Sequence, residues 1–475
     1  MITFLFGLVI LIVGGALYGR FADKMMRPTD SPTPAVRLKN GMDFIPMGKW
    51  KNSLIELLNI AGTGPVLGPV QGILFGPIAF IAIPIGCVIG GAFHDYMSGM
   101  IALRCNGAQM PGLVRQFLGK YVSFVYHVFI CLLMLLVGAV FIYTPGDLFV
   151  AQILGGSVDL GPRMIIVYGV IFAYYLAATL LPIDKIIGRI YPIFGAILLL
   201  SAVGIFLGLF LRGYPLQEVW EVGIMDIHPS GLHFIPMFFV TVACGIVSGF
   251  HSTQAAMISR TVSSEKHGRQ TFYNTMIAEG FIAMTWAAAA MGAVQIGLVG
   301  LEDLQTKAVP VVGIIARDML GNIGGSIAII GIIVLAITSG DTALRSLRMM
   351  LGDALAMDQA NHRKILILTA PLFLLVAGVL FFAKTDAGGF GILWRYFSWA
   401  NETIAVFAFA MIAVYMRQNK LPYLMALLPG MFYMYVVASY ILNAKIGFHL
   451  PWEITYPLAG VLTAVYAIAI ARCRV

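Results

Sequence analysis

The chain has 475 residues, of which 60% are hydrophobic and 11% are charged, and its mean hydropathy is +0.90. This composition excludes an ordinary soluble protein and indicates an integral membrane protein. The net charge of +8 comes from basic residues spread over short polar connections, which suits orientation in a bilayer better than nucleic-acid binding. The five cysteines lack metal-ligand spacing, so neither a zinc site nor a disulfide framework is predicted.

Apolar runs long enough to cross a bilayer recur along the whole chain. We predict an all-α polytopic membrane protein with about thirteen transmembrane helices. The predicted spans are residues 2–19, 54–75, 77–103, 122–146, 163–182, 189–211, 233–259, 271–298, 325–350, 365–383, 390–416, 421–442 and 453–471. Lys and Arg concentrate in the connections that this count places in the cytoplasm. The predicted N-terminus is therefore outside and the C-terminus cytoplasmic.

The second predicted span carries the helix-breaking sequence IAGTGPVLGP at residues 60–69. In a helix interior, glycine costs about 1 kcal/mol relative to alanine and proline about 3 kcal/mol, so unwinding is expected near Gly62 to Pro65. Unwound backbone at membrane depth is tolerated only where it is buried in protein or lines a polar cavity. The break therefore indicates a binding site, although small residues that permit close helix packing are an alternative interpretation.

A second polar interruption, Ser248 to Gln254, lies in the seventh predicted span. If residues 2–19 form an added helix, the two interruptions open the first and sixth helices of the core. Two broken helices at matching positions predict a five-plus-five inverted repeat with a transport site. The predicted organisation is an extra helix and cytoplasmic loop (1–53), a first repeat (54–212), a second repeat (233–416) and two C-terminal helices (421–475).

Ionisable residues inside the predicted spans are candidates for function because they are costly in a membrane. His94 and Asp95 either pair structurally or line the site. His251 and Gln254 are three residues apart and therefore share one helix face, and they indicate proton handling, substrate binding or a satisfied buried histidine. Glu279 either pairs across helices or titrates.

Two further polar groups occur in later spans. The segment Thr338 to Thr342 offers oxygen ligands for Na⁺ or a proton site at Asp341, and an Asp341–Arg345 pair at i,i+4 is equally compatible with the sequence. Arg395, Asn401 and Glu402 place a cation, an amide and a carboxylate in the eleventh predicted span. Arg395 either attracts an anionic substrate or snorkels to the interface.

Six motifs carry a resemblance to a known family. They are residues 60–69 (IAGTGPVLGP), 90–95 (GGAFHD), 249–254 (GFHSTQ), 265–269 (EKHGR), 337–342 (ITSGDT) and 393–397 (LWRYF). The chain resembles the carbon starvation protein A (CstA) family of inner-membrane transporters linked to peptide and pyruvate uptake. That family is similar to the amino acid, polyamine and cation (APC) transporters, and the resemblance implies that Thr338 and Ser339 match an ion site of sodium-coupled relatives.

The predicted function is secondary transport of small carboxylates or peptides, such as pyruvate or short peptides, by ion-coupled alternating access in the cell inner membrane. The coupling ion is H⁺ or Na⁺, with H⁺ favoured, and no catalytic residue, metal site, cofactor or nucleic-acid partner is predicted. The alternatives are a membrane-embedded enzyme and a channel. The predicted substrate-binding residues are Ala61, Gly62, Thr63, Gly64, Pro65, Gly249, Phe250, His251, Gln254 and Arg395. The predicted coupling residues are Asp95, Glu279, Thr338, Ser339, Asp341 and Glu402.

Overall fold

The computed structural model describes residues 1–39, 44–180, 184–223, 228–355, 357, 362–386 and 388–473. Within these residues the chain folds into helices joined by short connections, and the single β-bridge pairs Met47 with Val262. The predicted all-α class is therefore confirmed.

The chain forms two compact units, each assembled from several segments. The first comprises Met1–Phe129, Leu216–Met284 and Ser398–Val475, and the second comprises Ile130–Pro215 and Thr285–Phe397. Each unit contains residues from both predicted repeats. The five-plus-five repeat itself stays a prediction.

Helices of the first unit supply both interrupted spans. They are α1 (Ile2–Val9), α2 (Gly15–Met26), α3 (Pro34–Arg37), α4 (Lys49–Ile60), α5 (Gly64–Gly72), α6 (Ala79–Gly86), α7 (Ala92–Arg104), α8 (Met110–Leu118), α12 (Val219–Val222), α13 (Phe234–Ile246), α14 (Gly249–Ile258), α20 (Leu424–Asn443) and α21 (Trp452–Arg472). Single turns of other helix types join α1 to α2 and α6 to α7, and η6 (Arg269–Tyr273) precedes α15.

The second unit is built mainly on long apolar helices. Its own helices are α10 (Pro162–Leu180), α11 (Asp184–Leu211), α16 (Leu301–Thr306), α17 (Ala308–Ala354) and α18 (His362–Thr385). Three helices have residues in both units, namely α9 (Lys120–Leu148), α15 (Asn274–Gln295) and α19 (Gly389–Gln418).

Among the described residues, eleven helices are long and apolar enough to cross a membrane, and the bent pair of α4 and α5 makes a twelfth. The remaining predicted span, 189–211, falls in α11, which contains the apolar stretch Gly195–Leu211. The total of thirteen therefore stays a prediction. The predicted end of the span 163–182 lies outside the described residues.

The structure extends one predicted span toward the N-terminus. The sequence predicts a helix over 325–350, but α17 begins at Ala308 and kinks at Gly321, where φ is 71°. A Cβ on Gly325 would lie 2.5 Å from the Cα of Arg317, so the chain turns back closely on itself after the kink. Hydropathy alone did not reveal this short additional helix.

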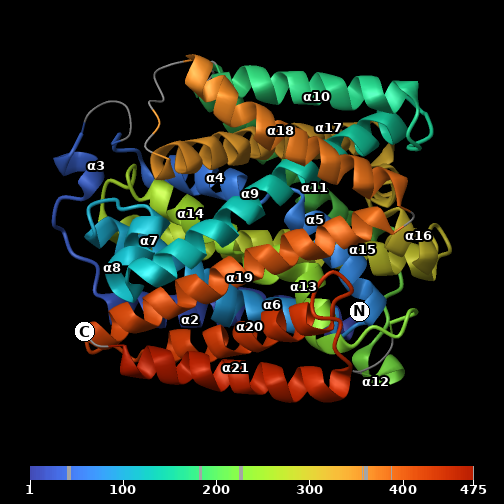
Figure 1. Cartoon of the computed structure of the whole chain (residues 1–475). Coiled ribbons are helices and arrows are strands. Elements are labelled where there is room, and N and C mark those ends of the chain that lie inside the picture. The colour runs from blue at the N-terminus through green and yellow to red at the C-terminus, as the bar shows by residue number, and fades with distance from the viewer. Residues whose placement is uncertain are drawn as a thin grey trace. The chain divides into compact units, whose positions relative to one another are not determined.

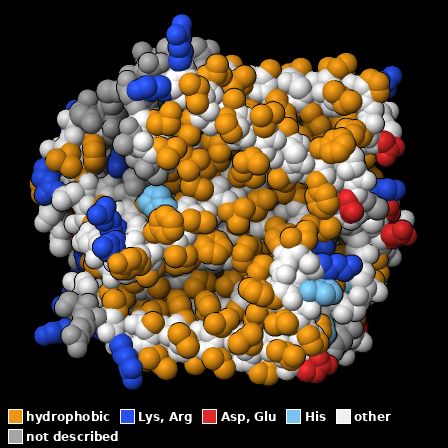
Figure 2. Space-filling view, in the orientation of Figure 1, with side chains coloured by type: hydrophobic (Ala, Val, Ile, Leu, Met, Phe, Trp, Pro, Cys, Tyr) orange, Lys and Arg blue, Asp and Glu red, His pale blue; other side chains and the backbone are white. Residues whose placement is uncertain are grey.

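The C-terminal helices of the first unit carry an exposed apolar face. Helices α20 and α21 lie side by side (Figure 1). The outer face of α21 exposes Ile454, Val461, Val465 and Ile468, and Figure 2 shows hydrophobic side chains along this helix. Such a face suits contact with lipid.

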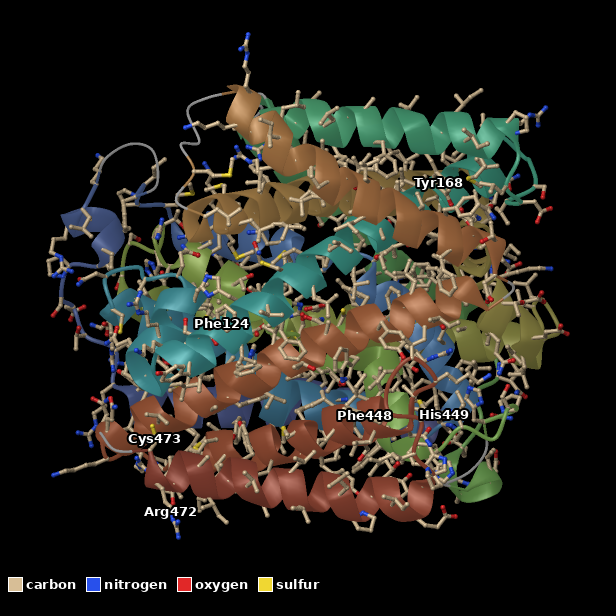
Figure 3. All side chains as sticks on the ribbon, in the orientation of Figure 1. Phe124, Tyr168, Phe448, His449, Arg472 and Cys473 are labelled. Carbon is tan, nitrogen blue, oxygen red and sulfur yellow. The ribbon has the colours of Figure 1, made fainter. Side chains whose placement is uncertain are left out.

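The end of α21 is tied to α19 by hydrogen bonds from one arginine. Arg417 donates to the Ile470 carbonyl at 2.8 Å and also to the carbonyls of Ala471 and Cys473. Figure 3 labels Arg472 and Cys473 at this end of the helix. A cation at a helix C-terminus complements the helix dipole, so Arg417 stabilises the end of α21.

An ion pair is buried in the second unit. The Lys384 ammonium lies 2.8 Å from an Asp147 carboxylate oxygen and 4.4 Å from the centre of the Tyr143 ring. The Tyr168 hydroxyl, labelled in Figure 3, donates to Asp147 at 2.7 Å. These contacts join α9, α10 and α18. The Lys384 and Asp147 side chains are at most 5% exposed.

Candidate functional site

The first predicted break is present and lies between α4 and α5. The two helices meet at a bend of 52°, and Ala61 leaves helical geometry with φ −80° and ψ 63°. Residues 61–63 are non-helical, whereas Gly64 and Pro65 already belong to α5. Proline suits the first turn of a helix because no N–H is needed there. The unwound segment is thus slightly N-terminal to the predicted one.

The second predicted break lies between α13 and α14. Val247 (φ −149°, ψ 133°) and Ser248 (φ −137°, ψ 122°) are fully extended, and α14 begins at Gly249. Both Val247 and Ser248 are buried. Their peptide groups therefore leave the helix inside protein rather than in contact with lipid, as unwound membrane segments require.

The two broken spans pack against one another within the first unit. Helix α5 lies along α13, and α4 lies along α14. The contact is close at Gly64, where an added Cβ would lie 2.3 Å from the Cβ of Cys244. Small residues therefore do promote helix packing here, and they also bring the two breaks into one buried region.

Asn401 of α19 stabilises the second break. Its side-chain oxygen accepts hydrogen bonds from the Phe250 N–H at 2.9 Å and from the Ser248 hydroxyl at 3.1 Å. An added Cβ on Gly249 would lie 2.4 Å from the Asn401 carbonyl oxygen, so only glycine permits this approach. Asn401 thus acts as the N-terminal cap of α14, a role that the Ser248 side chain does not take.

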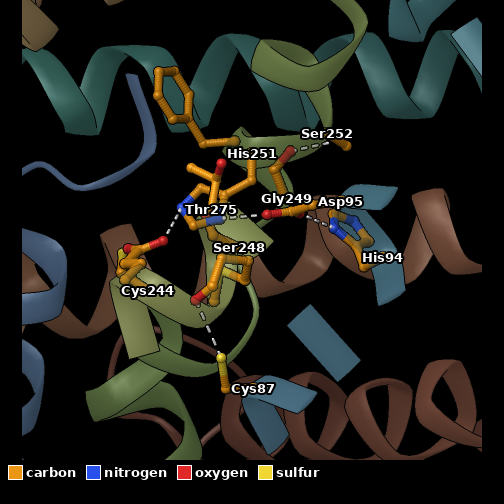
Figure 4. Close-up of polar contacts among 12 residues, drawn as sticks. Cys87, His94, Asp95, Cys244, Ser248, Gly249, His251, Ser252 and Thr275 are labelled. Carbon is orange, nitrogen blue, oxygen red and sulfur yellow. Dashed lines mark hydrogen bonds and ion pairs between the residues drawn. The ribbon is translucent and has the colours of Figure 1, made fainter. Parts of the chain in front are cut away.

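Asp95 connects two histidines beside this break, as Figure 4 shows. One carboxylate oxygen lies 2.7 Å from Nδ1 of His94, and the other lies 3.1 Å from Nδ1 of His251. On the opposite side of its ring, Nε2 of His251 lies 3.6 Å from Glu279. The residues come from α7, α14 and α15, and each side chain is at most 1% exposed.

This cluster holds two carboxylates and two histidines. In the described part of the chain, no lysine or arginine pairs with Asp95 or Glu279, so only the histidines can supply positive charge. Both Glu279 oxygens and Nε2 of His94 are buried without a hydrogen-bond partner among the described residues. A buried carboxylate in these surroundings either shares a proton or is protonated, because an unpaired buried charge is very costly.

The structure places many predicted substrate-binding residues at the two helix breaks, whereas the Gln254 side chain bonds only to its neighbour in sequence among the described residues. Thr63 has a buried hydroxyl without a hydrogen-bond partner in the described residues, and Phe250 is half-buried at the second break. The Gln254 side chain donates to the neighbouring Thr253 hydroxyl at 3.2 Å.

Four predicted residues belong to the second unit, namely Arg395, Thr338, Ser339 and Asp341. Asp341 lies 3.4 Å from Arg345, which agrees with the structural pair considered from the sequence. The Thr338 hydroxyl donates to the Leu335 carbonyl at 2.9 Å. Arg395 is half-buried on α19. Glu402 lies in the first unit, fully buried, and neither carboxylate oxygen has a described hydrogen-bond partner.

The places of two polar residues in the site were not predicted. Asn401 was noted in the sequence only beside Arg395 and Glu402, and its capping of α14 depends on a contact 151 residues away. Glu56 lies near the start of a predicted span, where a carboxylate is ordinary. In the structure its side chain is completely buried.

Interrupted helices that pack around buried ionisable groups are typical of secondary transporters. A solved structure shares this fold. The crystal structure of a manganese transporter from Eremococcus coleocola, in complex with an aromatic bis-isothiourea substituted compound, matches 91% of this chain and 96% of its own. The TM-score is 0.61 and the sequence identity is 10%. At this identity the likeness concerns the fold alone.

The chain belongs to the carbon starvation protein CstA family, because the family model matches residues 1–157 and 144–302. An uncharacterized membrane protein of Haemophilus influenzae is 38% identical over 61% of this chain and 91% of its own length. Peptide transporter CstA of Campylobacter jejuni is 24% identical over 58% of this chain, and pyruvate/proton symporter BtsT of Escherichia coli is 24% identical over 57%. The matches cover 48% and 46% of those two transporters, so the chain spans about half their length.

Proposed function

We propose that the protein is a secondary transporter that imports small carboxylates, such as pyruvate or short peptides, together with protons. The observation that carries this proposal is the Asp95–His251–Glu279 cluster, buried beside the second helix break. The names of two relatives, a peptide transporter and a pyruvate/proton symporter, support the substrate class and the coupling ion.

The substrate carboxylate binds at the helix breaks. The first N–H groups of a helix lack internal partners, and the positive end of the helix dipole attracts anions. At the start of α5 the Gly64 N–H is the available donor, because Pro65 has no N–H and the Val66 N–H donates to the Thr63 carbonyl. At the start of α14, Asn401 already accepts the Phe250 N–H. Ala61, Gly62 and Thr63 provide the adjacent unwound backbone, and we assign His251 to the substrate-facing side of the second break.

Protonation of His251 couples the ion to the substrate. When both ring nitrogens of His251 carry protons, the ring is a cation between Asp95 and Glu279. When one of these protons is lost, two carboxylates face a neutral ring. The packing of α14 against α7 and α15 is therefore expected to depend on the proton. In the proposed cycle this dependence permits the site to open to one side of the membrane only when proton and substrate are both bound or both absent.

The remaining predicted residues have secondary places in this proposal. Glu402 is a further buried acid of the first unit, while Arg395, Thr338, Ser339 and Asp341 belong to the second. The Asp341–Arg345 contact favours a structural role for that aspartate. We therefore assign coupling first to Asp95, His251 and Glu279, and to H⁺ rather than Na⁺.

The proposal is tested with the full chain reconstituted in proteoliposomes. Uptake of labelled pyruvate and of dialanine is measured with an inward proton gradient, an inward sodium gradient or no gradient. We expect concentrative uptake of at least one substrate with the proton gradient only. Accumulation driven by sodium alone contradicts proton coupling, and equilibration without accumulation under every gradient indicates a channel.

A paired variant assigns the coupling site. Glu279→Gln should accumulate less substrate under a proton gradient while retaining exchange of internal for external substrate, because the binding site remains but the proton-dependent charge is gone. Glu453→Gln, at an exposed glutamate that begins α21, is the matched control and should behave like the wild type. If Glu279→Gln accumulates substrate normally, Glu279 does not couple.

We further propose that the chain lies in the cell inner membrane with its N-terminus outside and its C-terminus in the cytoplasm. The distribution of Lys and Arg among the connections supports this orientation. A C-terminal fusion to a reporter that is active only in the cytoplasm should give signal. Signal from a reporter active only outside would contradict the orientation.

A further inference from the structure

Glu56 is a buried carboxylate to which no role has been assigned above. It lies on α4, one turn before the first break, and its exposed fraction is 0%. Neither of its carboxylate oxygens has a hydrogen-bond partner among the residues that the structure describes. A glutamate in this environment is far more costly than an apolar residue of similar size, which favours a functional reason for its presence.

The surroundings of Glu56 are acidic. Helix α4 packs on α14, whose His251 contacts both Asp95 and Glu279, the carboxylates of the proposed coupling cluster. It also packs on η6, which carries Arg269 and Tyr273. The contact with η6 includes a 3.3 Å hydrogen bond from the Ser53 hydroxyl to the Gln270 carbonyl, and the Glu56 carboxylate accepts no hydrogen bond from Arg269 or from any other described residue.

Electrostatic balance limits how many of these acids are ionised together. Glu56, Asp95 and Glu279 are three buried carboxylates on helices that contact α14, which carries His251, and the second histidine, His94, contacts Asp95. His251 lies between Asp95 and Glu279, and its imidazolium neutralises at most one full negative charge. An ionised Glu56 would therefore be a third negative charge without a partner, so Glu56 holds a proton whenever Asp95 and Glu279 are charged.

We propose that Glu56 is the second proton-binding site of the transport cycle, so that two protons enter with each substrate molecule. This inference rests on the proposed function, because it assumes proton-coupled uptake through the Asp95 cluster. Glu56 gains its proton when the region faces outside, forming an O–H bond on one carboxylate oxygen. It releases that proton inside, and the electron pair of the broken O–H bond stays on the oxygen. His251 and Glu279 hold the other proton.

Two protons per substrate have an electrical consequence. Pyruvate carries one negative charge, so entry with two protons moves one net positive charge inward, whereas entry with one proton moves none. A wild-type protein should therefore respond to membrane potential as well as to a pH difference. Glu56→Gln has no group to protonate at this position and should respond to the pH difference alone.

The test uses the reconstituted full chain, labelled pyruvate and a fixed pH difference. A potassium gradient with valinomycin then sets an inside-negative potential. For one net charge, a tenfold potassium gradient should raise the accumulation ratio of the wild type about tenfold and leave that of Glu56→Gln unchanged. Glu56→Asp keeps a titratable group and should retain the potential response, which a purely structural role for the glutamate would not predict.

Folding of each variant is checked by substrate exchange without any gradient. If Glu56→Gln fails to exchange, Glu56→Met replaces it, because an apolar side chain removes the need for a hydrogen-bond partner. A potential response in Glu56→Gln or Glu56→Met equal to that of the wild type overturns the inference while leaving proton coupling intact. A potential-independent wild type that still accumulates pyruvate overturns it as well. If the wild type accumulates no substrate under any proton gradient, the proposed function fails and the inference fails with it.

Discussion

At the scale of single residues, the site depends on polar side chains held where the helices break. Asp95 contacts both histidines, and Asn401 caps α14. Asn401 also donates to the Ser248 hydroxyl at 2.9 Å, so one amide satisfies several groups of the second break. The removal of this side chain would leave buried donors and acceptors unpaired.

Asn401→Ala should destabilise the protein by about 1 to 3 kcal/mol, because it removes a helix cap and leaves buried polar groups unsatisfied. The measurement is the thermal unfolding midpoint in detergent. Asn419→Ala is the matched control just after the end of α19, since Asn419 is exposed and its side chain donates to the Tyr415 carbonyl of that helix. Equal midpoints for the two variants would contradict the capping role.

Sequence reasoning identified the ionisable residues of the site better than it identified their partners. Asp95, His251 and Glu279 were recognisable because ionisable groups are rare inside apolar spans. Their mutual contacts were not, since α7, α14 and α15 meet only in the folded unit. Asn401 is an uncharged amide within a long helix, and nothing local in the sequence links it to Ser248.

At the scale of helices, the two interruptions were predictable because glycine and proline disfavour helix locally. Which residues unwind depends on packing. The first break ends before Gly64 because Gly64 and Pro65 suit the first turn of α5, where Gly64 must also fit against Cys244. The second break, by contrast, is held extended by a contact with α19.

Gly249→Ala should disrupt the contact between α14 and α19. Its new Cβ would lie within 2.5 Å of backbone atoms of Asn401 and Ala405, so a helix must shift. We expect a loss of about 1 to 3 kcal/mol in stability, together with reduced uptake. Gly460→Ala on α21 is the control, because nothing lies within 4 Å of its added Cβ. Comparable stability and uptake in both variants would show that the close approach is not required.

The buried ion pair of the second unit gives another test of helix packing. Lys384→Met leaves Asp147 buried without its cation and should lower stability by about 3 to 5 kcal/mol. The double variant Lys384→Met with Asp147→Leu removes both charges and should recover much of that loss. Thermal unfolding of the two proteins provides the comparison. A double variant as unstable as the single one would show that the pair is not the cause.

At the scale of the whole molecule, hydropathy predicted the all-helical membrane class, and the family followed from motifs spread along the chain. Neither hydropathy nor these motifs predicted the division into two units. Both broken spans belong to the first unit, although the sequence assigns them to different repeats. This grouping arises from contacts between segments far apart in sequence, which no local pattern records.

The central claim is that substrate and protons cross the membrane together through the Asp95 cluster. The most direct measurement is the internal pH of proteoliposomes, followed with a trapped dye, when pyruvate or dialanine is added without any imposed gradient. We predict internal acidification with at least one of these substrates in the wild type and slower acidification in Asp95→Asn, which cannot hold the charge between the two histidines. Substrate entry without acidification in the wild type, or acidification at the wild-type rate in Asp95→Asn, would contradict the claim.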